Sequence, residues 1–195
     1  MASLAPEERV ILVGHSMGGY WISAAMESFP EKVSVAVFCT ALMPSPELSY
    51  TTLSAEVNRI LDSDMDIVFT YGNGPNKQTT WFLFGPDFMC SKLYQLSPPE
   101  DLTLALLLAR PLPVYNDEAM WNEAMTLTKD KYGSVHRVFV LCDRDNAIQE
   151  DFQRWMIENN PSDDMKLISG SDHMPMFSKP KELYFCLQEI VEKYP

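Results

Sequence analysis

A pentapeptide near the amino terminus limits the folds open to this chain. Gly14-His15-Ser16-Met17-Gly18 fits the pattern G-x-S-x-G, follows an apolar run at residues 10–13, and precedes a helix-like segment that stops at Pro30. In that context the glycines permit a sharp turn between strand and helix, which lifts the serine hydroxyl above the sheet. The backbone N–H of Met17, at the helix N-terminus, is then aimed at the place where an oxyanion would form. The sequence predicts Ser16 as a nucleophile and Met17 as an oxyanion donor.

Further strand-like runs alternate with helical patterns along the chain. Residues 33–40, 135–142 and 165–169 are strand-like, and the first run is continuously apolar, as expected of a strand covered on both faces. Residues 149–160 and 180–194 carry apolar side chains at helical spacing. Strands that alternate with helices predict an α/β fold with a mostly parallel sheet and right-handed crossovers.

A long segment with a different pattern separates the second and third strands. It contains short β-like runs at residues 67–71 and 79–84 around a turn at residues 72–75, and an apolar helix that ends near Arg110. A connection this long inside a compact domain is usually functional, typically a lid or cap. We therefore predict a core formed by residues 1–46 and 129–195, and a cap formed by residues 47–128.

A serine nucleophile needs a base, and the chain has three histidines. His15 adjoins the serine, and we expect its backbone geometry to point it away from the site. His136 begins an apolar strand, which favours a structural or surface role. His173 lies in Gly170-Ser171-Asp172-His173-Met174, directly after the last strand, where the active-site loops of parallel sheets emerge. By elimination and by position, the sequence predicts His173 as the base.

The carboxylate that orients this base should follow the preceding strand, which gives the chain order Ser, Asp, His. Asp143 and Asp145 both lie there; Asp143 is nearer the strand end, where a surface pair with Arg144 would be its alternative role. Asp172 adjoins the base in sequence, but a neighbour rarely turns its carboxylate onto the adjacent imidazole. We prefer Asp145, in part because of the resemblance described below.

The size and net charge of the chain limit the number of domains and the classes of partner that we expect. The chain of 195 residues is long enough for one compact domain, and it carries 15 Lys and Arg against 27 Asp and Glu, a net charge of −12 at pH 7. Such a surface repels phosphate backbones and anionic lipids, so we expect neither nucleic acid nor membrane partners. The four cysteines are far apart and mostly flanked by apolar residues, which favours free thiols in a reducing compartment. Met1–Arg9 lacks a basic start followed by an apolar run, so we expect no signal segment and a cytoplasmic protein.

Four motifs, GHSMGG, LYQLSPPEDLTLA, FQRW and GSDHM, resemble the plant methylesterase family, relatives of the hydroxynitrile lyases. The likeness runs from about Glu7 to Tyr194. It implies a cytoplasmic protein that has the α/β-hydrolase fold with an inserted cap. It also implies hydrolysis of methyl esters of small hormones or metabolites such as salicylate, jasmonate and indole acetate. It also implies that no cofactor or metal is needed, and it aligns the second carboxylate of the family's acidic pair with Asp145. A homodimer is left open.

The same resemblance implies a pocket and a shorter amino terminus. By similarity, the acyl pocket is lined by Leu42, Phe82, Phe84 and Met174, whose alternative role is ordinary core packing. Family chains begin several dozen residues earlier, with strands and a His-Gly loop that donates a second oxyanion N–H. We expect those N-terminal strands to be missing here, which leaves the strand before Ser16 at an open sheet edge.

Two positions separate the esterase from the lyase. By the same resemblance, the lyase branch has the pattern G-E-S-x-G and a lysine directly after the catalytic histidine. This chain has His15 in place of that glutamate and Met174 in place of that lysine. Without that ammonium, cyanohydrin cleavage lacks a charge partner. The sequence therefore predicts a serine carboxylesterase that acts on small-molecule esters. The first alternative, which the missing segment favours, is a protein that binds a small ligand without catalysis or a truncated inactive form. The second, which His15 and Met174 disfavour, is a hydroxynitrile lyase.

Overall fold

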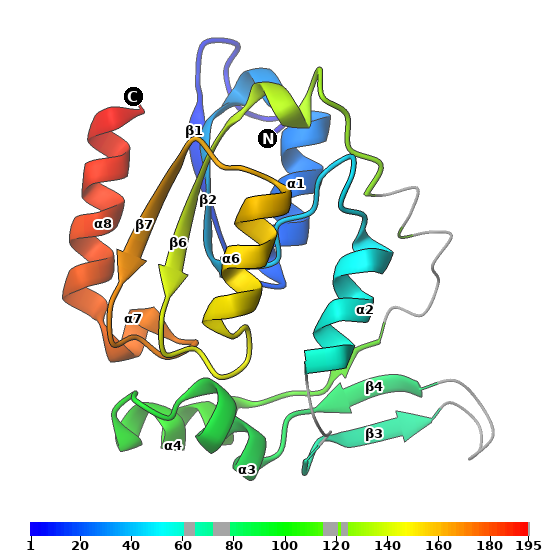
Figure 1. Cartoon of the computed structure of the whole chain (residues 1–195), viewed down its shortest axis with the longest axis vertical. Coiled ribbons are helices and arrows are strands. Elements are labelled where there is room, and N and C mark those ends of the chain that lie inside the picture. The colour runs from blue at the N-terminus through cyan, green and yellow to red at the C-terminus, as the bar shows by residue number, and fades with distance from the viewer. Residues whose placement is uncertain (61–64, 72–78, 115–120, 122–124, 195) are drawn as a thin grey trace.

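A four-stranded parallel sheet forms the centre of the molecule (Figure 1). The computed structural model describes residues 1–60, 65–71, 79–114, 121 and 125–194. Within them, the sheet has the order β1-β2-β6-β7 and contains β1 (Val10–Ser16), β2 (Val33–Ala41), β6 (His136–Cys142) and β7 (Asp164–Ile168). The predicted parallel α/β sheet is thus confirmed, and β1 lies at one of its edges.

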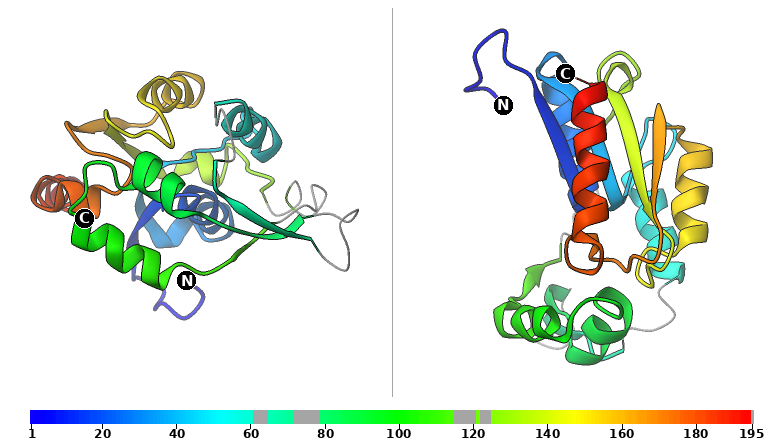
Figure 2. Two further views of the ribbon diagram at one scale, coloured as in Figure 1. Left: turned by 90° about the horizontal axis from the view of Figure 1, so that it is seen from below. Right: turned by 90° about the vertical axis from the view of Figure 1, so that its left-hand side faces the viewer.

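Helices cover both faces of this sheet, as Figure 2 shows. On one face, Val35 and Val37 of β2 pack with Ile190 of α8 (Pro180–Lys193). On the other face, alternate β2 residues pack with side chains from α1 (Gly18–Ser28), α2 (Tyr50–Ile60) and α6 (Glu150–Asn159). Because β2 and β6 carry helices on both sides, their sequences are almost continuously apolar.

A second, smaller layer lies beyond the carboxyl ends of the strands (Figures 1 and 2). It contains an antiparallel sheet and short helical segments, namely β3 (Val68–Tyr71), β4 (Thr79–Leu83), β5 (Leu112–Pro113), α3 (Pro86–Phe88), the π-helix η2 (Met89–Leu93) and α4 (Pro99–Leu108). Its apolar cluster is separate from the core. The turn predicted at residues 72–75 lies outside the described residues.

Both ends of the inserted segment pack into the core and not into this layer. Leu48 and Leu53 on the N-terminal side, and Trp121 and Leu127 on the C-terminal side, belong to the main core cluster. The separate layer therefore occupies only the middle of the predicted cap, residues 47–128. No helix in the described part of the chain is long and apolar enough to cross a membrane.

Two glycines allow α1 to approach the sheet closely. A Cβ on Gly14 would lie 2.9 Å from the backbone of Gly18, and a Cβ on Gly19 would lie 1.9 Å from the carbonyl oxygen of Leu42. The same test on Gly18 finds nothing within 4 Å. Of the two glycines after Ser16, Gly19 is thus the one that the packing requires.

This difference gives a matched pair of stability variants. Gly19→Ala should lower the free energy of unfolding by about 1–3 kcal/mol or more, because the backbone at Leu42 must move. Gly18→Ala should be neutral or stabilising by up to about 1 kcal/mol, because alanine favours the helix. Urea unfolding followed by circular dichroism measures both, and equal losses in the two variants would contradict the packing argument.

Candidate active site

Ser16 lies at the junction of β1 and α1 with a backbone φ of 55°. A non-glycine residue in this left-handed region is strained, and such strain concentrates at functional sites. The turn closes because Gly14 has no side chain to collide with Gly18. Ser16 is partly exposed and is the last residue of β1, so it lies at the carboxyl end of the parallel sheet.

Asp145 and His173 meet in the loops that follow β6 and β7. His173 Nδ1 lies 2.7 Å from Asp145 Oδ2, and the two residues are only 4% and 3% exposed. A carboxylate only accepts hydrogen bonds, so Nδ1 carries the proton and Nε2 keeps a free lone pair. This is the tautomer that a general base requires. No hydrogen bond joins Ser16 Oγ to His173 within the described part of the chain.

The loop that carries Asp145 is fixed by hydrogen bonds at several points. Asp145 Oδ1 accepts hydrogen bonds from the N–H groups of Ala147 at 2.7 Å and Ile148 at 2.8 Å. The buried side chain of Gln153, from the FQRW motif on α6, binds the N–H and the carbonyl of Cys142 and the carbonyl of Ile148. Gln153 therefore closes the loop at both ends, which holds the carboxylate at a constant position.

The other two candidate carboxylates have different partners. Asp143 accepts hydrogen bonds from Gly170 N at 2.6 Å and Ser169 Oγ at 2.9 Å. It therefore joins the loop after β6 to the loop after β7. Asp172 is fully buried and accepts from Met174 N at 2.9 Å. Neither carboxylate bonds to the imidazole of His173. Of the three aspartates, Asp145 is the one that geometry places against the base.

His15 lies against His173, contrary to the prediction that it points away. The two ring centroids are 4.8 Å apart, and His15 Nε2 lies 2.6 Å from the backbone oxygen of His173. Because that oxygen is an acceptor, His15 Nε2 carries the proton. Burial, assisted by the neighbouring His173, lowers the pKa of His15 to about 4. His15 is therefore a neutral donor at pH 7 that holds the base loop.

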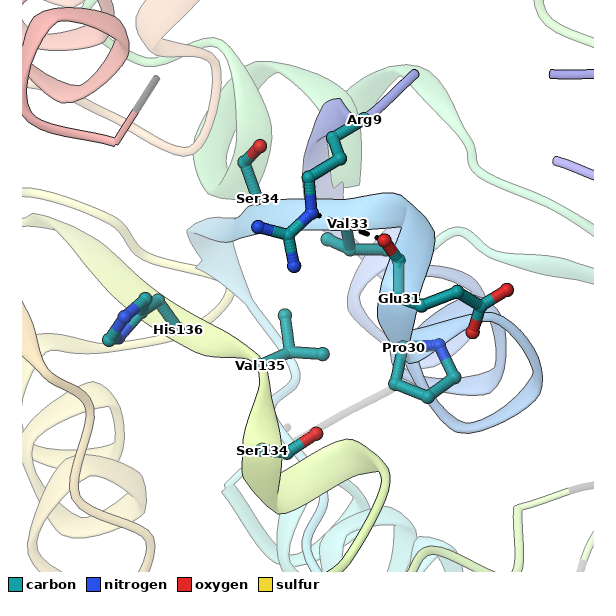
Figure 3. A pocket seen from close by; sticks show the side chains of 8 residues that line it. All are labelled: Arg9, Pro30, Glu31, Val33, Ser34, Ser134, Val135 and His136. Carbon is teal, nitrogen blue, oxygen red and sulfur yellow. Dashed lines mark hydrogen bonds between the residues drawn. The ribbon is translucent and has the colours of Figure 1, made fainter. Parts of the chain in front are cut away.

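His136 is exposed at the start of β6, as the sequence predicts, and its Nδ1 lies 3.1 Å from Asp163 Oδ1. It lies beside a depression of about 350 Å³ at the amino ends of β2 and β6, which also includes Arg9, Glu31 and Ser134 (Figure 3). The guanidinium of Arg9 already donates to the carbonyl of Glu31 at 3.1 Å. The depression lies at the opposite end of the strands from Ser16 and belongs to no part of the site.

The LYQLS segment (residues 93–97) of the smaller layer contacts the loops after β6 and β7, which carry Asp145 and His173. Gln95 Nε2 donates to the carbonyl of Arg144 at 2.6 Å, beside Asp145. The N–H of Leu96 and the hydroxyl of Ser97 donate to Asp172 at 2.9 and 2.8 Å, beside His173. The smaller layer is thus anchored to the loops that carry Asp145 and His173.

The four predicted pocket residues divide into two groups. Phe82 and Phe84 lie edge to face at 5.1 Å, and Phe84 and Met174 pack on the apolar cluster of the smaller layer. Leu42 is buried in the main core, where its carbonyl faces Gly19. The structure thus associates Phe82, Phe84 and Met174 with the layer above the site, and Leu42 with the core beneath it.

Known proteins resemble this chain in both sequence and structure. A model of the alpha/beta hydrolase family matches residues 2–184. Over its full length the chain is 53% identical to methyl jasmonate esterase 1 of Vitis vinifera and 43% identical to methylesterase 3 of Arabidopsis thaliana, of which it covers 74% and 73%. The crystal structure of tomato methylketone synthase I with 2-tridecanone superposes with a TM-score of 0.93 at 45% identity, and the match covers all of this chain and 75% of that one.

These relatives are longer than this chain, and they confirm the resemblance carried by its four motifs. The chain belongs to the α/β-hydrolase family, within the group of plant methylesterases and their relatives.

Proposed function

We propose that the protein is a serine carboxylesterase with Ser16 as nucleophile, His173 as base and Asp145 as orienting acid. The observation that carries the proposal is the buried hydrogen bond between His173 Nδ1 and Asp145 Oδ2, which leaves Nε2 as the basic nitrogen. Asp145 and His173 follow the carboxyl ends of β6 and β7, and the parallel strand β1 ends at the same edge in the strained turn of Ser16. The named relatives of this chain include esterases, which supports the same reaction class.

In the proposed reaction, His173 Nε2 removes the proton of Ser16 Oγ as this oxygen attacks the ester carbonyl. The backbone N–H of Met17, at the start of α1, stabilises the negative charge on the carbonyl oxygen. His173 then returns the proton to the departing alcohol, and an acyl group remains on Ser16. Water, deprotonated by the same imidazole, releases the acid and restores the serine.

We further propose methyl esters of small carboxylic acids as substrates, with methanol as the leaving group. The relative from Vitis vinifera is named as a methyl jasmonate esterase, and 53% identity makes an ester of similar size reasonable here. Phe82 and Phe84 of the smaller layer, and Met174, which packs against that layer's apolar cluster, supply apolar surface that suits an apolar acyl group. Met174 also carries no charge, so the cation expected for cyanohydrin cleavage has no equivalent directly after His173.

One observation favours a second function, binding of a small ligand without turnover. Ser16 Oγ makes no hydrogen bond to His173 in the described structure, and a serine that never reaches its base would not be activated. Catalytic hydrogen bonds often tighten only when substrate is bound, so this geometry is also compatible with the esterase. Turnover measurements separate the two functions.

The acid is tested by a pair of variants with the same chemical change. Asp145→Asn should lower kcat on a small aromatic methyl ester by about 10⁴-fold, because an amide in place of the carboxylate favours the wrong tautomer of His173. Asp143→Asn should cause a much smaller loss, because the Asp143 carboxylate accepts hydrogen bonds from Gly170 and Ser169, whereas the His173 ring bonds to Asp145. Steady-state hydrolysis assays measure both, and the reverse ranking would move the acid to Asp143.

The reaction type is tested with two substrates. The purified protein should release acid from small aromatic methyl esters and release no cyanide from mandelonitrile, since Met174 provides no cation for cyanide. Ser16→Ala, the matched control, should abolish ester hydrolysis. Cyanide release at a rate equal to that of ester hydrolysis would establish the lyase instead, and tight ester binding without any turnover would favour the binding protein.

The neutral state of His15 gives a pH dependence of stability. Its folded pKa of about 4 lies below the ordinary value of 6.5, so the unfolded chain binds the proton more readily. The contribution of His15 to the free energy of unfolding is fully present above pH 6.5. It is lost as the pH falls toward 4, and the loss amounts to about 3 kcal/mol in all. His15→Gln should flatten this decrease in urea unfolding between pH 7 and 4, and His136→Gln should not; equal pH slopes in wild type and His15→Gln would contradict it.

A further inference from the structure

A bulge interrupts the pairing of β1 and β2 at the end next to Ser16. His15 pairs with Cys39 and Ser16 pairs with Ala41, so Thr40 is an extra residue on β2. The bulge also turns Ala41 onto the α1 face of the sheet, although regular alternation after Val37 and Cys39 would place it on the α8 face. Bulges of this kind occur next to active sites, where they redirect a side chain.

Thr40 occupies this bulge at a conformational cost. Its φ is 36°, in the left-handed region that a β-branched residue adopts only under strain. It is also completely buried. A strained, buried threonine persists only where the surrounding structure holds it in place.

The hydroxyl of Thr40 contacts the acid of the proposed triad. Thr40 Oγ1 donates to Asp145 Oδ2 at 2.5 Å, and the same oxygen accepts the hydrogen bond from His173 Nδ1. The other oxygen is held by two backbone N–H groups. The Thr40 hydroxyl is therefore the one side-chain donor besides the base itself that the described structure places on this carboxylate.

We propose that Thr40 is a positioning residue for the ester hydrolysis proposed above, on which this inference rests. Its hydroxyl fixes the plane of the Asp145 carboxylate, so that Oδ2 stays aligned with Nδ1 while His173 gains and loses a proton. It also shares the negative charge of Oδ2, which limits how strongly the carboxylate holds the imidazolium. The bulge and its strain are what bring the hydroxyl from the end of β2 to the loop after β6.

The test compares three substitutions at this one position. Thr40→Val keeps the β-branched shape and the backbone strain but removes the donor, so kcat on a methyl ester should fall about tenfold while KM changes little. Thr40→Ser keeps the hydroxyl and should retain most of the activity. Thr40→Ala also lacks the donor but has less bulk, so the comparison does not depend on valine folding correctly.

A second readout would not respond to a merely structural role. Without the shared hydrogen bond, Asp145 should hold the protonated imidazole more tightly, so the acidic limb of kcat/KM should move to higher pH in Thr40→Val and Thr40→Ala. Thr40→Ser should keep the wild-type limb. Wild-type kcat and pH profile in a folded Thr40→Val, or an equal loss in Thr40→Ser, would overturn the proposal. Wild-type turnover by Ser16→Ala would instead overturn the esterase itself.

Discussion

A carboxylate withdrawn from water must be matched by hydrogen-bond donors, and this requirement organises the carboxyl end of the sheet. Asp145 is only 3% exposed, yet its two oxygens accept from Thr40, Ala147, Ile148 and His173. These donors come from the end of β2, from the loop after β6 and from the loop after β7. Satisfying one buried charge therefore fixes three segments that are distant in the sequence.

The smaller layer is attached to the same region through short polar contacts. Gln95 binds the backbone of Arg144, Asn146 binds the carbonyl of Ser91, and Asp172 accepts from Leu96 and Ser97. Each contact joins the η2–α4 region to a loop that carries Asp145 or His173. A displacement of this layer would therefore disturb the loops that carry His173 and Asp145.

The sequence predicted the elements that depend on local pattern. The parallel sheet, the turn at Ser16 and the loops of Asp145 and His173 follow from apolar runs and from chain order, and the fold is confirmed. The predicted orientation of His15 was wrong, because the side chain is held by the backbone carbonyl of His173, 158 residues away in the sequence. Thr40 had no sequence signal, since a bulge is set by pairing with a neighbouring strand and not by the run VFCTA.

The central claim, that Asp145 and His173 activate Ser16, is tested most directly by covalent labelling with a fluorophosphonate followed by peptide mass spectrometry. We expect a single adduct on the peptide that contains Ser16, formed more slowly in Asp145→Asn and at close to the wild-type rate in Asp143→Asn. An adduct that forms at the wild-type rate in Ser16→Ala, or labelling of Ser16 that is unchanged in both His173→Ala and Asp145→Asn, would contradict it.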